Sequence, residues 1–111
     1  MASSTDFALV YTTAPDLAVA EAIGSQLVEE GLAACVNVLP GMRSIYSWQG
    51  QVQRDEEVVA LVKTRANLAA RVIARIEDLH PYDVPAAFVI PTSGGSSEFL
   101  KWVGEQTDAG D

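Results

Sequence analysis

The chain has 111 residues, and we expect one domain over residues 1–111. Its 15 acidic and 7 basic side chains give a net charge of −8, which argues against nucleic acids and anionic membranes as partners because like charges repel. No apolar run approaches the ~20 residues of a membrane span, no targeting pattern is present, and Cys35 alone cannot form an intrachain disulfide, so we expect a cytoplasmic protein.

A strand and a helix are predicted at the start of the chain. Residues 6–13 form an apolar, β-prone run that ends at Ala14-Pro15, which indicates a buried strand. Apolar residues then recur at helical spacing, and Gly31 is a typical stop signal, so a helix is predicted over about 15–30. Thr13 or Ala14 is its expected cap, and Asp16 suits the positive end of its dipole.

Residues 33–64 predict two long β arms joined at 48–51, and the rest of the chain is organised around this ribbon. One face is expected to be apolar, because apolar residues occupy even-numbered positions, and alternate residues of a strand point to the same side. They are Val36, Val38, Met42, Tyr46 and Trp48 before the turn, and Val52, Val58, Ala60 and Val62 after it. Pro40-Gly41 indicates a bulge or bend. Arms of about 15 residues at about 3.3 Å each would overhang a domain with a radius of gyration of about 13 Å. We expect a partner subunit to cover the overhang.

A second amphipathic helix is predicted after the ribbon. Asn67 is its expected N-cap, and the helix should run to about His80. Its apolar stripe consists of Leu68, Val72, Ile76 and Leu79. Pro81 and Pro85 then bracket a tight loop, and residues 86–91 predict another strand.

Ser96 or Ser97 is the expected cap of a last helix, on which Phe99, Trp102, Val103 and Gln106 face one way. We expect residues 1–5 and 107–111 to be disordered. The order β-α-β-β-α-β with an extra C-terminal helix predicts the α+β class. It matches a ferredoxin-like sandwich with a long central β-hairpin, in which one antiparallel sheet carries helices on one face and leaves the other open for assembly.

Two residues are candidate metal ligands, each with a simpler structural explanation. Cys35 is a soft ligand for copper or zinc as a thiolate, or a small buried apolar residue. His80 is an imidazole ligand, or a residue that caps the end of the second helix. One Cys and one His do not complete a closed metal site, so other ligands would have to come from carboxylates or neighbouring subunits.

A binding cleft for a small polar or anionic ligand is the second hypothesis. This cleft is expected between subunits, and its candidate residues are Trp48, Glu57, Lys63, Tyr82 and Trp102. Glu57 either pairs with a cation or ligand or is simply exposed, and the tryptophans suit a pocket or a subunit contact equally well. General acid–base catalysis by Asp55 and Glu57 lacks a recognisable nucleophile or oxyanion hole, and we therefore do not expect an enzyme.

The motifs of the ribbon resemble those of the CutA divalent-cation tolerance family. They are Leu-Ala-Ala-Cys at 32–35, the Pro-Gly kink, Ser-x-Tyr-x-Trp-x-Gly at 44–50 and Lys63-Thr64. The loops at 13–16 and 80–85 and the pattern of Phe99, Leu100 and Trp102 extend the resemblance over about 7–105. The resemblance implies a homotrimer formed by edge pairing of the long strands, with an architecture similar to the PII signal proteins.

The resemblance also implies tolerance of copper and other divalent cations, with no obligatory cofactor. In the family's copper-binding pattern the ligands are a Cys and two consecutive His, and the corresponding positions here are Thr12, Leu79 and His80, so only His80 matches. The family often has Glu at the position of Ala86. We therefore expect a trimer that binds metal ions or small ligands between subunits without catalysis; the alternative is a PII-like signalling or assembly module.

Overall fold

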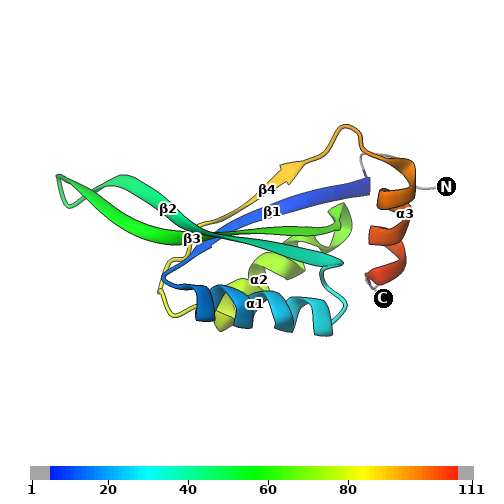
Figure 1. Cartoon of the computed structure of the whole chain (residues 1–111), viewed down its shortest axis with the longest axis horizontal. Coiled ribbons are helices and arrows are strands. Elements are labelled where there is room, and N and C mark those ends of the chain that lie inside the picture. The colour runs from blue at the N-terminus through cyan, green and yellow to red at the C-terminus, as the bar shows by residue number, and fades with distance from the viewer. Residues whose placement is uncertain (1–5, 108–111) are drawn as a thin grey trace.

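The computed structural model describes residues 6–107, which form a four-stranded antiparallel sheet with two helices beneath it and a third at one end (Figure 1). The strands lie in the order β2-β3-β1-β4, with bounds β1 Phe7–Ala14, β2 Cys35–Trp48, β3 Gln51–Arg65 and β4 Ala87–Pro91. The helices are α1 Leu17–Glu29, α2 Ala69–Leu79 and α3 Ser97–Gln106. This arrangement is the ferredoxin-like α+β fold that the sequence predicted.

The ribbon of β2 and β3 extends far beyond the helices (Figure 1). β1 pairs with β3 only as far as Ala14 opposite Val58, so the outer half of β3 lies beside β2 alone in the described sheet. The described chain is accordingly 49 Å long and 21 Å across its shortest axis. The turn at the tip holds Gln49 and Gly50 at φ of 51° and 78°, as a two-residue type I′ hairpin requires. The predicted overhang is confirmed.

A bulge at Pro40-Gly41 shifts the register of β2 by one residue, so the side chains after it point to the opposite faces from those that the uninterrupted alternation would give. Val38 lies opposite Ala60, but after the bulge Met42 lies opposite Glu57, one residue out of step. Opposed residues share a face and neighbours alternate, so Val38 faces the helices whereas Met42 faces the open side. The prediction of one shared face is therefore wrong beyond the bulge, and the residues moved to the open face with Met42 include Tyr46 and Trp48.

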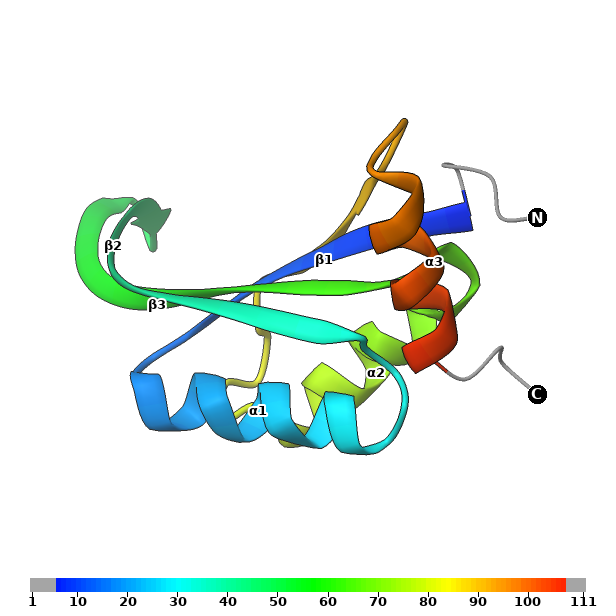
Figure 2. The same cartoon turned by 45° about the vertical axis from the view of Figure 1, so that its right-hand side comes forward.

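The core lies between the sheet and the helices α1 and α2, which cover the same face in both views (Figures 1 and 2). Val10 and Val62 from the central strands pack against Leu27 of α1, and these three side chains are fully buried. The predicted apolar stripe of α2 is confirmed, because its members belong to the same cluster: Leu68, Val72, Ile76 and Leu79.

The helix caps differ in part from those predicted. Asp16 caps α1, because its side chain accepts a 2.9 Å hydrogen bond from the Val19 N–H, so the expectation of Thr13 or Ala14 is wrong. Gly31 follows α1 at φ 73°, a left-handed conformation that favours glycine. The predicted cap Asn67 is also wrong: a 3-10 turn at 66–68 buries Leu68 and leads directly into α2.

α3 covers the end of the sheet opposite the ribbon tip (Figure 2). Ser96 caps it by accepting a hydrogen bond from the Phe99 N–H. Arg65 of β3 holds its far end, donating to the Gly104 carbonyl at 2.6 Å and to the Thr107 hydroxyl at 3.0 Å. Thr107, expected at the start of a disordered end, is buried. The other residues expected to be disordered, 1–5 and 108–111, lie outside the described residues.

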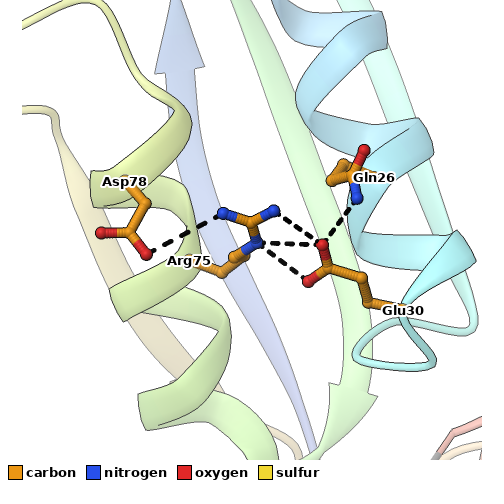
Figure 3. A network of polar contacts seen from close by, with 4 residues as sticks. All are labelled: Gln26, Glu30, Arg75 and Asp78. Atoms are coloured by element: carbon orange, nitrogen blue, oxygen red, sulfur yellow. Dashed lines mark hydrogen bonds and ion pairs between the residues drawn. The ribbon is translucent and has the colours of Figure 1, made fainter.

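An ion pair joins the two helices on their outer side (Figure 3). Arg75 of α2 donates through Nη2 to Glu30 Oε2 at 2.7 Å, and its Nε lies 2.9 and 3.0 Å from the two carboxylate oxygens. Gln26 donates to the same carboxylate at 2.6 Å. The hydrogen bonds from Arg75 and then from Gln26 lower the pKa of Glu30 from 4.5 to about 2.

This ion pair predicts a pH-dependent part of the stability. A carboxyl group whose pKa is lower in the folded state stabilises the fold above its unfolded pKa, near 4.5, and the contribution is lost as pH falls through its folded pKa. We expect wild type to melt above Glu30→Gln at pH 6, and the difference to disappear between about pH 4.5 and 2. Thermal unfolding by circular dichroism measures this. Glu29→Gln removes the neighbouring charge as a control, and an equal pH dependence there would contradict the assignment.

Candidate functional site

A pocket of about 670 Å³ lies on the open face of the sheet, where the ribbon leaves the body of the domain. It lies beside Tyr11 of β1, and the loop at 80–86 contributes Tyr82. The ribbon supplies Ser44, Tyr46, Trp48, Asp55 and Glu57. We call this cavity the open-face pocket. Of the five residues predicted for a binding cleft, the structure brings Trp48, Glu57 and Tyr82 together here.

Hydroxyl groups hold the two carboxylates of the open-face pocket. Glu57 accepts a 2.6 Å hydrogen bond from the Ser44 hydroxyl at Oε1, and a longer one of 3.4 Å from the Tyr82 phenol at Oε2. Asp55 accepts a hydrogen bond from the Tyr46 phenol. Glu57 is half-buried and not simply exposed, and its pairing with a cation or ligand stays a prediction. Ser44 was not identified from the sequence as a contributor to the site.

Both phenols near the carboxylates are stabilised in their neutral form. The hydrogen bond to Asp55 raises the pKa of Tyr46, and partial burial followed by the negative charge of Glu57 raises the pKa of Tyr82. Tyrosine has a pKa near 10 in water, so both groups remain hydrogen-bond donors at neutral pH. The pocket therefore combines negative carboxylates with neutral aromatic rings.

His80 anchors the loop that carries Tyr82. Its ring is buried, and Nε2 lies 2.7 Å from the Thr13 carbonyl oxygen, so Nε2 carries the proton. Nδ1 accepts a 3.1 Å hydrogen bond from the Tyr82 backbone N–H. Metal ligation through either nitrogen would cost one of these bonds. Ligation by His80 therefore stays a prediction, and the hydrogen bonds give the residue a structural function.

The other predicted site residues lie at the opposite end of the open face. Cys35 is half-exposed and lies across from Lys63 in the ladder. The Lys63 ammonium lies 5.2 Å from the ring centroid of Phe99, which in turn packs against Trp102 on α3. Lys63 and Trp102 are therefore separate from the open-face pocket. Within residues 6–107, no group of three or more His, Cys, Asp or Glu side chains is arranged to hold a metal ion.

Comparison with known proteins agrees with the fold and the ribbon motifs. The model of the CutA1 divalent ion tolerance protein family matches residues 8–106. The chain belongs to the CutA1 family. Its relative from Thermus thermophilus, a divalent-cation tolerance protein CutA, is 46% identical across 89% of this chain and 96% of its own length. The crystal structure of CutA from Xylella fastidiosa covers 93% of this chain and 99% of its own, at 43% identity and a TM-score of 0.90.

Membership of the CutA1 family confirms the resemblance identified from the sequence and connects the protein with divalent-cation tolerance. The family description names tolerance of ions and no reaction. No helix in the described part of the chain is long and apolar enough to cross a membrane. The cytoplasmic location stays a prediction.

The structural function of His80 predicts a loss of stability on truncation. His80→Ala removes two hydrogen bonds from a buried site, and we expect the free energy of unfolding to fall by about 2–3 kcal/mol. Urea denaturation measures this change. Asp83 in the same loop is exposed. As a control, Asp83→Ala should leave the free energy of unfolding within about 0.5 kcal/mol of the wild-type value. Equal stabilities for wild type and His80→Ala would rule out the anchoring function.

Proposed function

We propose that this protein is a homotrimer that binds cations in clefts between subunits and catalyses no reaction. The observation that carries the proposal is the open-face pocket, in which Asp55 and Glu57 lie together at the base of an overhanging ribbon. The function follows the divalent-cation tolerance of the family. The choice of cation is the part of the proposal that metal titration tests.

The surface of the ribbon supports assembly. Ile45 and Val52 are 66% and 61% exposed and share one face of the ribbon in the ladder register. Trp48, on the opposite side, is 61% exposed. The sheet order also leaves β2 and β4 as edge strands, and on β4 Phe88 is 61% exposed. The unpaired backbone of an apolar edge strand can pair with a strand of another chain. A second and a third copy of the chain would cover both the edge strands and the apolar side chains of the ribbon.

The charge of the open-face pocket supports cations as ligands. Asp55 and Glu57 retain acceptor positions beyond those used by Ser44, Tyr46 and Tyr82, because an ionised carboxylate offers about four lone-pair sites. Within one described chain these two carboxylates are too few for a complete metal site. A metal ion here would therefore draw further ligands from a neighbouring subunit. Oxygen donors favour a hard cation, and copper specificity would need the imidazole of His80 or the thiol of Cys35.

A second candidate function is a PII-like signalling or assembly module that binds a small organic ligand in the same cleft. The aromatic rings of Tyr46, Trp48 and Tyr82 around the pocket favour this alternative, since organic ligand sites are lined largely by apolar and aromatic groups. A downstream protein partner would then detect the occupied state. Both functions share the trimer and the pocket, and they differ in the ligand.

The proposed trimer predicts an effect of charge on the ribbon. Ile45→Glu would bury an unpaired carboxylate at a subunit contact, so we expect the trimer to dissociate at least about tenfold more readily. Native mass spectrometry across a dilution series measures this. Leu17→Glu on α1, where the native side chain is 44% exposed, is the matched control and should leave the assembly unchanged. A wild-type protein that is monomeric at micromolar concentration would contradict the proposal.

Cation binding predicts a loss of metal uptake when the pocket is neutralised. We expect metal-free trimer to take up Cu²⁺, Zn²⁺ or Mg²⁺ in integral stoichiometry, and Glu57→Gln to weaken this uptake by about tenfold because it removes a charged ligand. Isothermal titration calorimetry at neutral pH measures both. Parallel titration of His80→Ala and Cys35→Ser tests the metal ligands predicted from the sequence. Uptake that none of the three substitutions changes would place the metal elsewhere.

A further inference from the structure

We infer that the open-face pocket binds an organic ammonium ion, such as an alkylamine or a linear diamine. The inference rests on the proposed cation-binding function of this pocket and names its ligand class. It follows from three properties of the described residues: the sign of the charge that faces the pocket, the geometry of the acceptors, and the aromatic side chains around them. The charge distinguishes an ammonium ion from an anion, and the acceptors and aromatic side chains distinguish it from a bare metal ion.

The charge that faces the pocket is negative. Glu57 and Asp55 alternate with Glu56 along β3, so both lie on the open face while Glu56 lies on the other face. Arg43 of β2 lies opposite Glu56 in the ladder but also lines the pocket, where it is the one cationic side chain among the lining residues. Lys63 lies beside Phe99 at the far end of the sheet. The lining thus holds two carboxylates for one cation, and this net negative charge disfavours an anionic ligand.

The acceptors suit an ammonium group better than a metal ion. Ser44 occupies one oxygen of Glu57 at 2.6 Å, and the Tyr82 phenol approaches the other only to 3.4 Å, which leaves that oxygen weakly bonded. A divalent Mg²⁺ or Ca²⁺ needs about six or more oxygen ligands. A primary ammonium group has only about three N–H donors to satisfy, and two carboxylates with remaining lone pairs can accept them.

The aromatic rings supply the rest of the ligand contact. Tyr46, Trp48 and Tyr82 line the pocket together with Met42 and Val84. A cation within about 6 Å of an aromatic ring is attracted by the electrons of the ring face, and the phenols stay neutral because both tyrosine pKa values are raised. Carbon atoms attached to the ammonium group would contact the apolar side chains. A hydrated metal ion would gain nothing from these surfaces.

The experiment titrates the assembled protein with 1,4-diaminobutane by isothermal titration calorimetry at neutral pH, with succinate and 1,4-butanediol as anionic and neutral probes of equal chain length. We expect the diamine alone to bind. Glu57→Gln should raise its Kd at least about tenfold, because a charge-assisted hydrogen bond is lost. Glu56→Gln removes the adjacent carboxylate from the opposite face of the strand, and it should leave the Kd within about twofold. Asp55→Asn provides a second test of the pocket should Glu57→Gln not fold.

The outcomes separate this inference from the proposed function. Divalent metal uptake without diamine binding would overturn the ammonium ligand and leave the cation-binding trimer standing. A protein that binds neither a divalent metal ion nor the diamine would overturn both the ammonium ligand and the proposed cation binding. Equal weakening by Glu57→Gln and Glu56→Gln would show general attraction to an acidic surface and would also overturn the inference. Diamine binding that depends on Glu57 and not on Glu56 would support it.

Discussion

The bulge at Pro40-Gly41 determines which side chains the overhanging ribbon presents on each face. Before it, alternate residues of β2 contribute to the core above α1; after it, the parity is exchanged and the same alternation serves the open face. Because one extra residue reverses every side chain that follows, a strand without the bulge would turn Ser44 and Tyr46 away from the open face. The open-face pocket therefore depends on the backbone conformation at Pro40-Gly41, although neither residue lines the pocket.

The exchanged parity also explains the hydrogen bonds of the pocket. Ser44 lies directly opposite Asp55 in the ladder but donates to Glu57, and Tyr46 lies opposite Gln53 but donates to Asp55. Both bonds therefore join diagonal neighbours, which long side chains reach across an antiparallel pair. In each bond the acceptor lies two residues beyond the opposed residue along β3. One backbone feature thus places two carboxylates and their hydroxyl donors in a single row.

The fold was largely predictable from the sequence because its signals are local and strong. The helical stripe of α2 and the turn at Gln49-Gly50 follow from residue periodicity and turn chemistry. The face of Tyr46 was not predictable, because the sequence located an irregularity at Pro40-Gly41 without showing that it adds a residue to one strand.

The candidate site was predicted only in part, since it depends on distances between segments. Glu57, Trp48 and Tyr82 do lie at one pocket, whereas Lys63, only six residues from Glu57 and of the same parity, lies against α3 at the other end of the strand. At about 3.3 Å per residue this spacing is about 20 Å, so Glu57 and Lys63 of the same chain are too far apart to hold one small ligand. His80 shows the converse: its buried bonds to Thr13 and Tyr82 required the loop and β1 to be placed together.

Assembly and binding are thermodynamically linked if the proposed subunit contact closes the pocket. Trp48 is both an exposed apolar residue of the ribbon and part of the pocket wall, so the same side chain would contribute to both events. A ligand that binds only the assembled form stabilises it by RT ln(1 + [L]/Kd), which is about 2.7 kcal/mol at a hundredfold excess over Kd. The ligand and the neighbouring subunit would then each increase the affinity for the other, since such coupling is reciprocal.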